Sequence, residues 1–379
     1  MKKALMVASV ASMIKQFNMQ NIKLLQEMGY KVTVATNFEV SNHEPKDSSI
    51  KLIKKLESIG VDVVQISMDR SPFRVKNYKA YLKLKKTIDN GKFDLIHCQS
   101  PVGGVLTRLA AINSKAKVIY TAHGFHFYEG ASWINWAIFY PIEKVLSKCT
   151  DDLIVINNED FEAAKRLNSK RIHYVPGIGI DIQNIKSKKG NRPKLVKNLN
   201  ISDENTILIS VGELNNNKNQ KSIIKALEYL KDQSIVYLIC GVGEKDNELK
   251  ALANTLGVEN KVKFLGYRFD IIELLKSSDI FVFPSYREGL SVSLMEAKAT
   301  GLPCIVSDIR GNNDLIMEGK EGFRLNPDDS RGFSKRILEL HLNPDKRKEM
   351  SFNNLQTVNK YSIENINDNM RNIYNLSDK

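Results

Sequence analysis

Cysteines are few in this chain, and none is placed for chemistry that needs a pair. The 379 residues contain four of them, Cys98, Cys149, Cys240 and Cys304, far apart in the sequence. There is no CxxC pair and no Cys/His ligand spacing, so the sequence predicts neither a zinc site nor a disulfide framework. We expect reduced, mostly buried thiols in a cytoplasmic protein.

Long apolar runs are also lacking. No stretch approaches the roughly 20 apolar residues of a membrane-spanning helix. The N-terminus superficially resembles a signal peptide, because apolar residues follow Met-Lys-Lys. However, Lys15, Gln16 and Asn18 soon end the apolar run. A first β-strand is therefore the better interpretation.

Acidic residues are scarce in the first half relative to basic ones. Residues 1–190 hold 29 Lys and Arg against 17 Asp and Glu, whereas residues 191–379 hold 27 against 26. A basic half joined to a neutral half suggests an anionic partner for the basic half. Nucleic acid, an anionic membrane surface and a phosphorylated lipid would all suit this charge, as would a role in solubility alone. No nucleic-acid-binding motif is recognisable, so we expect no nucleic-acid partner.

The length and the order of apolar runs predict two α/β domains. A chain of 379 residues exceeds what one core usually supports. Near-continuous apolar runs alternate with helical patterns, as expected of parallel strands covered by helices on both faces. The expected strands are residues 4–9, 31–36, 62–66, 94–98, 117–121, 153–157, 206–211, 235–240, 262–265, 280–284 and 303–307.

A polar segment over residues 186–193, with Gly and Pro, separates the two series of strands. We place the boundary between the expected domains at the start of this segment, so that they comprise residues 1–185 and 186–360. Doubly wound sheets of this kind bind ligands at the carboxyl ends of their strands. We therefore expect functional residues directly after the strands.

Two carboxylates flank one such strand end. Glu288 follows the expected strand 280–284, and Glu296 lies about two turns into the next helix. Between them, the free amides at the helix start form an anion site. Carboxylates on both sides of an anion site suit a ligand with phosphate in the middle and hydroxyls at both ends, as in a nucleotide-sugar. The alternative is an ordinary helix with one surface and one half-buried glutamate.

The segment 285–297 resembles the E-x7-E motif of glycosyltransferase family 4, whose members are retaining sugar-nucleotide transferases. Further blocks occur in the order of that family, at residues 121–127, 211–218, 240–243, 264–268 and 310–316. The resemblance covers nearly the whole length and is strongest to bacterial capsule and exopolysaccharide enzymes that extend a lipid-linked sugar. It implies a GT-B fold, that is, two facing Rossmann-like domains with doubly wound parallel sheets. The first domain would hold the acceptor, the second would hold the donor, and a C-terminal helix within residues 361–379 would cross back to the first.

The resemblance also implies roles for single residues. Lys218 would neutralise the diphosphate leaving group, whose charge grows as the sugar bond breaks. His123 would contact the transferred sugar, and the aromatic residues after it could stack on a sugar face. Glu288 would accept hydrogen bonds from the donor sugar and Glu296 from the ribose. His123, Lys218 and Glu288 are thus the predicted catalytic residues.

Other residues complete the predicted site. Tyr267 and Arg268 would flank the nucleobase, and the glycines at strand ends would permit close backbone approach. The predicted donor site comprises Gly212, Lys218, Gly241, Gly243, Tyr267, Arg268, Glu288, Gly289, Leu290, Ser291 and Glu296. On the acceptor side we expect Ser9 and Ser12, where many relatives have a Gly-Gly loop, together with His126.

One position departs from the family pattern. Many members carry Arg where this chain has Glu213, and both cations then hold the diphosphate. Here Lys218 either acts with the helix amides alone, or another cation such as Arg268 or Lys298 contributes. No Asp-x-Asp sits at a strand end, so we expect no metal and no cofactor besides the UDP-sugar substrate.

Both tryptophans, Trp133 and Trp136, lie three residues apart on one expected helical face in the basic half. Such a pair near lysines is a feature of interfacial membrane binding. Packing of the helix onto the sheet is the favoured interpretation.

Together these features predict a cytoplasmic, metal-independent, retaining glycosyltransferase, peripheral at the inner face of the cell membrane. It would move a hexose or N-acetylhexosamine from a UDP-sugar to a polyprenyl-phosphate-linked glycan. No nucleophile is evident, which favours a front-face displacement. A sugar-nucleotide 2-epimerase is an alternative, although no convincing acid and base for the sugar C2 are visible. A non-catalytic scaffold of a polysaccharide assembly complex is another, mildly favoured by Glu213.

Overall fold

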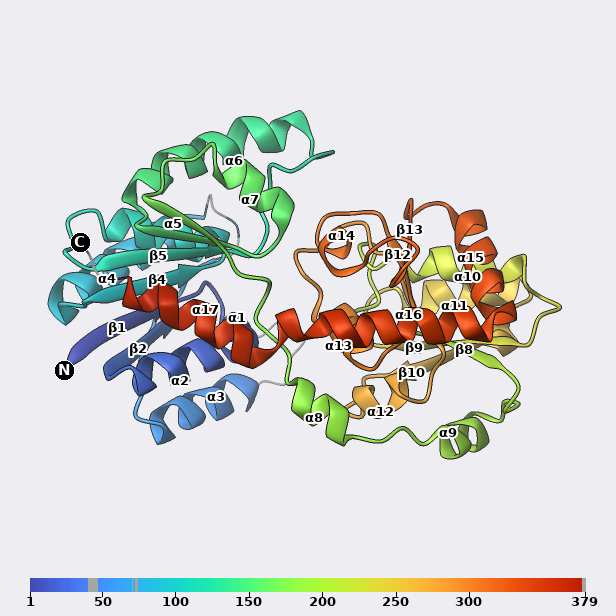
Figure 1. Cartoon of the computed structure of the whole chain (residues 1–379). Coiled ribbons are helices and arrows are strands. Elements are labelled where there is room, and N and C mark those ends of the chain that lie inside the picture. Colours follow the sequence, from blue (N-terminus) through green and yellow to red (C-terminus); the bar gives the residue numbers. More distant parts are fainter. Residues whose placement is uncertain (40–46, 70, 72–73, 377–379) are drawn as a thin grey trace. The chain divides into compact units, whose positions relative to one another are not determined.

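The computed structural model describes residues 1–39, 47–69, 71 and 74–376. The chain forms two compact units, Met1–Ile178 with Ile366–Lys379, and Gly179–Asn365 (Figure 1). The predicted boundary between residues 185 and 186 falls inside helix α8 (Ile182–Ser187). Ile182 and Ile185 of this helix are buried in the core of the second unit, so that unit begins before the polar segment.

The first unit contains a sheet of seven parallel strands in the order β3-β2-β1-β4-β5-β6-β7. The strands are β1 (Lys2–Val7), β2 (Tyr30–Thr36), β3 (Asp62–Gln65), β4 (Leu95–Gln99), β5 (Lys117–Ala122), β6 (Asp152–Val155) and β7 (Arg171–Tyr174). The helices are α1 (Ala11–Phe17), α2 (Met19–Glu27), α3 (Asp47–Ser58), α4 (Lys76–Gly91), α5 (Pro101–Ala110), α6 (Trp133–Leu146), α7 (Asn158–Ala164) and most of α17 (Ile363–Asn375).

The second unit contains six parallel strands in the order β10-β9-β8-β11-β12-β13. The strands are β8 (Thr206–Val211), β9 (Ile235–Cys240), β10 (Val262–Gly266), β11 (Ile280–Phe283), β12 (Cys304–Ser307) and β13 (Gly322–Leu325). Besides α8, the helices are α9 (Arg192–Leu199), α10 (Gln220–Glu228), α11 (Asp246–Thr255), α12 (Ile271–Leu275), α13 (Val292–Ala299), α14 (Asn312–Leu315), α15 (Ser330–Leu342) and α16 (Pro344–Thr357).

The predicted fold class, two Rossmann-like doubly wound parallel-sheet domains, is confirmed. In both sheets the strand order reverses beside the first strand, between β1 and β4 and between β8 and β11. Loops that leave neighbouring strands in opposite directions open a crevice at such a reversal. Each unit therefore has one place at its carboxyl edge that suits a ligand.

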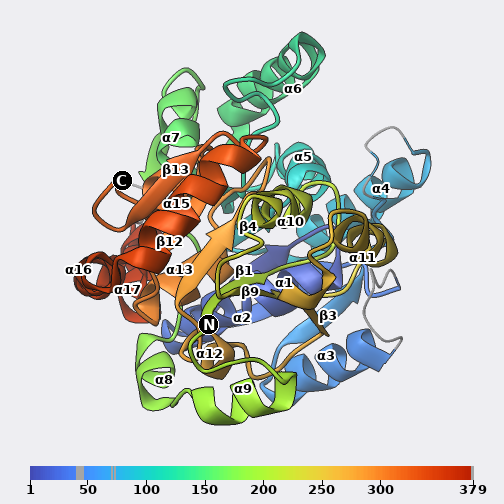
Figure 2. The ribbon, with the colours of Figure 1, turned by 90° about the vertical axis from the view of Figure 1, so that its right-hand side faces the viewer.

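Alternating side chains bury both faces of each sheet. In β1, Leu5 and Val7 belong to one core cluster, and Ala4 and Met6 belong to the other. In the second unit, α10, α11 and α15 cover one face, whereas α8, α9, α12 and α13 cover the opposite face (Figure 2). Because each strand is apolar on both sides, most strands stand out as continuous apolar runs in the sequence.

The sequence missed two strands, β7 and β13. Both lie at the edge of a sheet, and both contain polar residues or glycine, as in Arg-Ile-His-Tyr and Gly-Phe-Arg-Leu. An edge strand has a neighbour on one side only and is less completely buried, so its sequence carries a weaker apolar signal.

The C-terminal helix α17 packs on the first unit. Its residues Ile366, Met370, Ile373 and Tyr374 recur on one helical face and are buried in a core cluster that also contains residues of β1, β2, β4 and β5. At its C-terminal end the ammonium of Lys117 donates to the carbonyl of Ile373 at 2.6 Å and to that of Leu376, directly after the helix, at 2.7 Å. A cation at this end satisfies carbonyls that have no partner within the helix.

Tyr374 also completes a buried hydrogen-bond chain. Its hydroxyl lies 2.9 Å from Nδ1 of His97, whose Nε2 lies 2.8 Å from Oγ1 of Thr121. Burial, with a smaller contribution from His123, lowers the pKa of His97 to about 3, so the ring is neutral at physiological pH. A neutral ring has one donor and one acceptor nitrogen, and each has a partner here.

We expect Tyr374→Phe to destabilise the first unit by about 1–3 kcal/mol, because one buried nitrogen of His97 then has no partner. The measurement is urea unfolding of the full chain, monitored with a spectroscopic signal that reports on the first unit. Tyr78→Phe is the matched control, since Tyr78 is exposed on α4. Equal urea midpoints for the two variants would contradict a stabilising role of this hydrogen bond.

Candidate active site

Lys218 and Glu288 form an ion pair at the carboxyl edge of the second sheet. The ammonium Nζ of Lys218 lies 2.7 Å from Oε1 of Glu288 and 4.7 Å from the ring centroid of Phe283. Lys218 comes from the loop after β8 and Glu288 from the loop after β11, the two strands at which the order reverses. The structure thus brings together two of the three predicted catalytic residues.

Three asparagines hold the loop that carries Lys218. Oδ1 of Asn215 accepts the backbone N–H of the lysine at 3.0 Å. The amide of Asn217 donates to the carbonyl of Arg287, and that of Asn219 donates to the carbonyl of Pro284. An asparagine side chain can donate and accept, which suits it to tie two loops together. The prediction missed these positioning residues, although the run of asparagines in the turn was a visible signal.

The predicted glycines allow the loops to approach one another. A Cβ on Gly241 would lie 1.9 Å from the carbonyl oxygen of Gly212, and one on Gly243 would lie 2.3 Å from that of Leu214. A Cβ on Gly311 would similarly lie 1.9 Å from the carbonyl oxygen of Gly289. These contacts exclude any side chain. The structural role of the glycines is therefore contact within the chain, whereas the sequence-based expectation was approach to a ligand.

Helix α13 presents free amides between the two carboxylates. Ser291 is its N-cap, and the Ser291 hydroxyl accepts the backbone N–H of Leu294. Within the described residues, the N–H groups of Gly289, Leu290 and Ser291 donate to no acceptor. Unpaired amides at a helix N-terminus favour an anion, as the sequence analysis expected.

Glu296 lies in the second turn of α13, slightly nearer the helix start than predicted. Its side chain is half-buried, and in the described part of the chain its carboxylate has no hydrogen-bond or ion-pair partner. Burial raises the pKa of this carboxyl to about 7. An uncompensated carboxyl group of this kind is suited to accept hydroxyl hydrogen bonds from a ligand.

The two additional cations, Lys298 and Arg268, differ in their surroundings. Lys298 is wholly buried, where it pairs with Glu321 at 2.7 Å and donates to the carbonyl of Leu315 at 2.9 Å. It is committed to the interior and does not serve a ligand, so this expectation was wrong. Arg268 is exposed and forms a double hydrogen bond with Asp270.

Tyr267 lies on the same loop as Arg268, directly after β10. Its ring is 68 % exposed and meets the ring of Phe269 edge-on, with centroids 5.1 Å apart. The loop thus offers aromatic faces to a flat ligand, and their contact with a nucleobase stays a prediction.

In the first unit, His123 stands directly after β5, held by a neighbouring strand. Its Nε2 lies 2.6 Å from Oε1 of Gln99 at the end of β4. The amide of Gln99 donates in turn to Asn18, which lies between α1 and α2. Because the glutamine oxygen only accepts, Nε2 of His123 carries the hydrogen and Nδ1 is an acceptor. Burial lowers the pKa of His123 to about 4, so the ring is neutral.

The three predicted acceptor-side residues do not all lie at the strand reversal of the first sheet. Ser9 follows β1, and its N–H donates to the hydroxyl of Ser100 after β4, so it lies at the strand reversal of the first sheet. Ser12 is half-buried on α1. His126 stacks on Phe139 of α6, with centroids 4.5 Å apart, and so packs against a helix outside the reversal.

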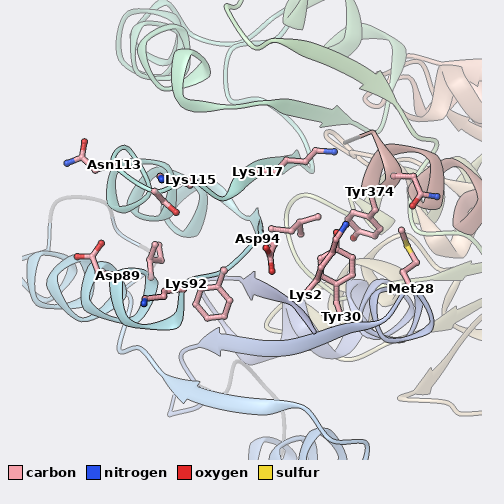
Figure 3. A pocket seen from close by; sticks show the side chains of 15 residues that line it. Lys2, Met28, Tyr30, Asp89, Lys92, Asp94, Asn113, Lys115, Lys117 and Tyr374 are labelled. Carbon is pink, nitrogen blue, oxygen red and sulfur yellow. The ribbon is translucent and has the colours of Figure 1, made fainter. Parts of the chain in front are cut away.

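A hollow of about 820 Å³ lies at the opposite edge of the first sheet. Lys2, Tyr30 and Lys117 line it from the strand starts, and Tyr374 lines it from the end of α17 (Figure 3). The predicted functional residues of this unit lie at the carboxyl edge, so the hollow is not the candidate site. Within the described ranges, no three His, Cys, Asp or Glu side chains gather in a way that could hold a metal ion.

We expect Glu296→Gln to stabilise the ligand-free protein at high pH. The folded carboxyl, with a pKa of about 7 against the ordinary 4.5, keeps a proton that the unfolded chain loses between these values. Stability therefore falls as the pH rises through this range, and glutamine removes the cost, which is on the order of 1–3 kcal/mol. Urea unfolding at pH 5 and pH 8 measures it, with Glu228→Gln as control, since Glu228 is an exposed residue of α10. An equal effect at both pH values would contradict a raised pKa.

Comparison with known proteins identifies the family. Residues 18–183 match the family model described as Glycosyltransferase Family 4, and residues 191–357 match Glycosyl transferases group 1. A putative glycosyltransferase of Bacillus subtilis, EpsD, is 35 % identical over 98 % of this chain and 96 % of its own length. An Escherichia coli enzyme named UDP-Gal:alpha-D-GlcNAc-diphosphoundecaprenol alpha-1,3-galactosyltransferase is 31 % identical over 70 % of this chain and 71 % of its own.

Solved structures agree on the fold. Alr3699/HepE of Anabaena, solved in complex with UDP-glucose, superposes with a TM-score of 0.77 over 99 % of both chains at 19 % identity. Matches to both family models, with a relative similar over nearly the full length, show that the chain is a glycosyltransferase that belongs to family 4, with a group 1 region in its second half.

Proposed function

We propose that this glycosyltransferase moves a hexose or N-acetylhexosamine from a UDP-sugar to a lipid-linked glycan in the synthesis of a bacterial surface polysaccharide. We further propose that it retains the anomeric configuration and needs no metal. The observation that carries the proposal is the Lys218–Glu288 pair beside the free amides of α13. At one reversal of strand order, the pair offers a cation that can bind a phosphate and a carboxylate that can accept hydrogen bonds from sugar hydroxyls.

The donor's diphosphate would meet Lys218 and the helix amides. As the bond between sugar and phosphate breaks, negative charge grows on the departing UDP, and fixed donors at that place stabilise it. In the ligand-free chain Glu288 neutralises the lysine at 2.7 Å. Glu213, the departure from the family pattern, is exposed and accepts from Asn215, so it does not compete for the lysine.

The two glutamates would hold the ends of the donor. Glu288 accepts hydroxyl hydrogen bonds from the sugar, and Glu296 accepts them from the ribose. A bound ribose would give the Glu296 carboxylate the donors that it lacks in the ligand-free chain and so favour its ionised form. Donor binding near neutral pH would then release part of a proton.

The chemical step would be a front-face displacement. The acceptor hydroxyl oxygen bonds to the anomeric carbon from the side on which UDP leaves, and its proton passes to the departing phosphate oxygen. Neutral His123, with Nδ1 as acceptor, would orient a hydroxyl and would not act as a charged acid. No residue of the described chain needs to form a covalent intermediate in this scheme.

The acceptor class is supported by the relatives and by charge. The name of the Escherichia coli relative gives that enzyme an acceptor sugar on diphosphoundecaprenol. Residues 1–190 of this chain contain 29 basic and 17 acidic residues. This net positive charge suits a phosphorylated lipid in an anionic membrane. We therefore place the acceptor on a polyprenyl phosphate, at the inner face of the cell membrane.

UDP is expected to raise the melting temperature of the purified protein more than GDP or ADP, equally in EDTA and in Mg²⁺, because a ligand of the native state stabilises it by mass action. Lys218→Met should weaken UDP binding about 10- to 100-fold, as expected for loss of a charged hydrogen bond. Lys225→Met, on the exposed side of α10, is the control. No shift with any nucleotide would favour a non-catalytic scaffold.

With a UDP-sugar donor, UDP release should depend on a polyprenyl-diphosphate-linked acceptor. Proton NMR of the product should show the same anomeric configuration as the donor. Acceptor-independent UDP release would favour the epimerase alternative, and an inverted linkage would rule out the front-face displacement.

A further inference from the structure

Helix α6 exposes an apolar face. Ile134, Ile138, Ile142 and Val145 are all exposed, and their spacing of four, four and three places them on one side of the helix. Trp133, at the first position of the helix, is 77 % exposed. Both views show α6 on the outer side of its unit (Figures 1 and 2).

The buried side of α6 carries a carboxylate. Its one acidic residue, Glu143, is buried and forms a double hydrogen bond with Arg108 of α5 at 2.7 and 3.0 Å. The guanidinium of Arg108 lies 3.9 Å from the ring centroid of Tyr120 in β5. A surface helix normally exposes its charges and buries only one apolar side, whereas α6 buries its carboxylate and is apolar on its outer side as well as its inner side.

The orientation of α6 is fixed by contacts on its inner side. Trp136 packs partly against the core, and its indole N–H donates to the carbonyl of Tyr128 at 3.3 Å. The preferred interpretation, that both tryptophans pack onto the sheet, therefore holds for Trp136 and is wrong for Trp133. Because a buried ion pair and an aromatic contact fix the rotation of the helix about its axis, the same apolar residues are held on its outer side.

Charge decides which partner suits this face. A contiguous exposed apolar face of this kind marks a contact with a protein or a membrane. With Glu143 buried, basic groups lie near the C-terminal end of α6: the exposed Lys148, and Lys144, whose ammonium donates to the carbonyl of Arg166. Aliphatic residues, a terminal tryptophan and adjacent lysines match an interfacial helix on anionic lipid. Of the helices that the structure describes, none is both long and apolar enough to cross a membrane.

We propose that α6 docks on an anionic lipid surface, with Ile134, Ile138, Ile142 and Val145 below the headgroups. The proposal rests on the proposed function insofar as a lipid-linked acceptor brings the enzyme to a membrane. It goes further by assigning the membrane contact to one face of one helix. The basic half of the chain adds long-range attraction, whereas α6 supplies the apolar insertion.

The test is flotation of the full chain with vesicles of phosphatidylcholine, alone or with added phosphatidylglycerol. Wild-type protein should float with the anionic vesicles, and less so at high salt. Ile134→Asp/Val145→Asp should lower the partition coefficient at least about tenfold, since burial of one aliphatic side chain contributes about that factor. The matched control is Phe352→Asp, which also replaces an exposed apolar side chain, on α16.

The outcomes separate this proposal from the proposed function. The α6 variant should keep the wild-type melting temperature and the shift caused by UDP, so that lost flotation is not lost folding. Flotation equal to that of the wild type would overturn the proposal even where UDP binds. A wild-type dimer that the variant abolishes would also overturn it, by showing that a second copy covers this face. Flotation by α6 without any UDP shift would support the surface and count against the proposed function.

Discussion

The reversal of strand order in a parallel sheet is the constraint on which the candidate site depends. Because β8 and β11 are neighbours whose connections leave in opposite directions, their loops meet, and Lys218 reaches Glu288 at 2.7 Å. Asparagine side chains then hold the loops by hydrogen bonds to backbone carbonyls, and glycines allow close approaches that exclude a side chain. In the first unit, the pairing of the neighbouring strands β4 and β5 brings Gln99 beside His123.

In the described part of the second unit, some buried charged groups are paired with one another, whereas a carboxyl group near the candidate site is left without a partner. Lys298 and Glu321 compensate each other in the interior, whereas Glu296, on the same helix as Lys298, has no partner among the described residues. Burial without compensation raises its pKa to about 7 and costs stability in the ligand-free state. Loss of stability at a binding site is common, because groups placed for a ligand are incompletely satisfied without it.

The first unit uses buried polar groups for structure. Neutral His97 links Tyr374 of α17 to the sheet, Lys117 satisfies the end of the same helix, and Arg108 with Glu143 anchors α6. Each buried group has partners, which offsets the cost of removing it from water. These contacts hold two helices that differ in what they expose: α17 buries its apolar face, whereas α6 keeps an apolar face exposed.

The sequence by itself determined the class of fold and the list of candidate residues. Apolar runs buried on both faces carry a strong signal, and the loops after them hold Lys218, Glu288 and His123. It could not find β7 and β13, because the apolar residues of these two edge strands are interrupted by polar residues or glycine. It could not tell that Lys298 is committed to Glu321, that Gln99 orients His123, or that Trp136 is packed and Trp133 exposed. Those outcomes depend on contacts between residues far apart in the chain, which only the packing of strands and helices decides.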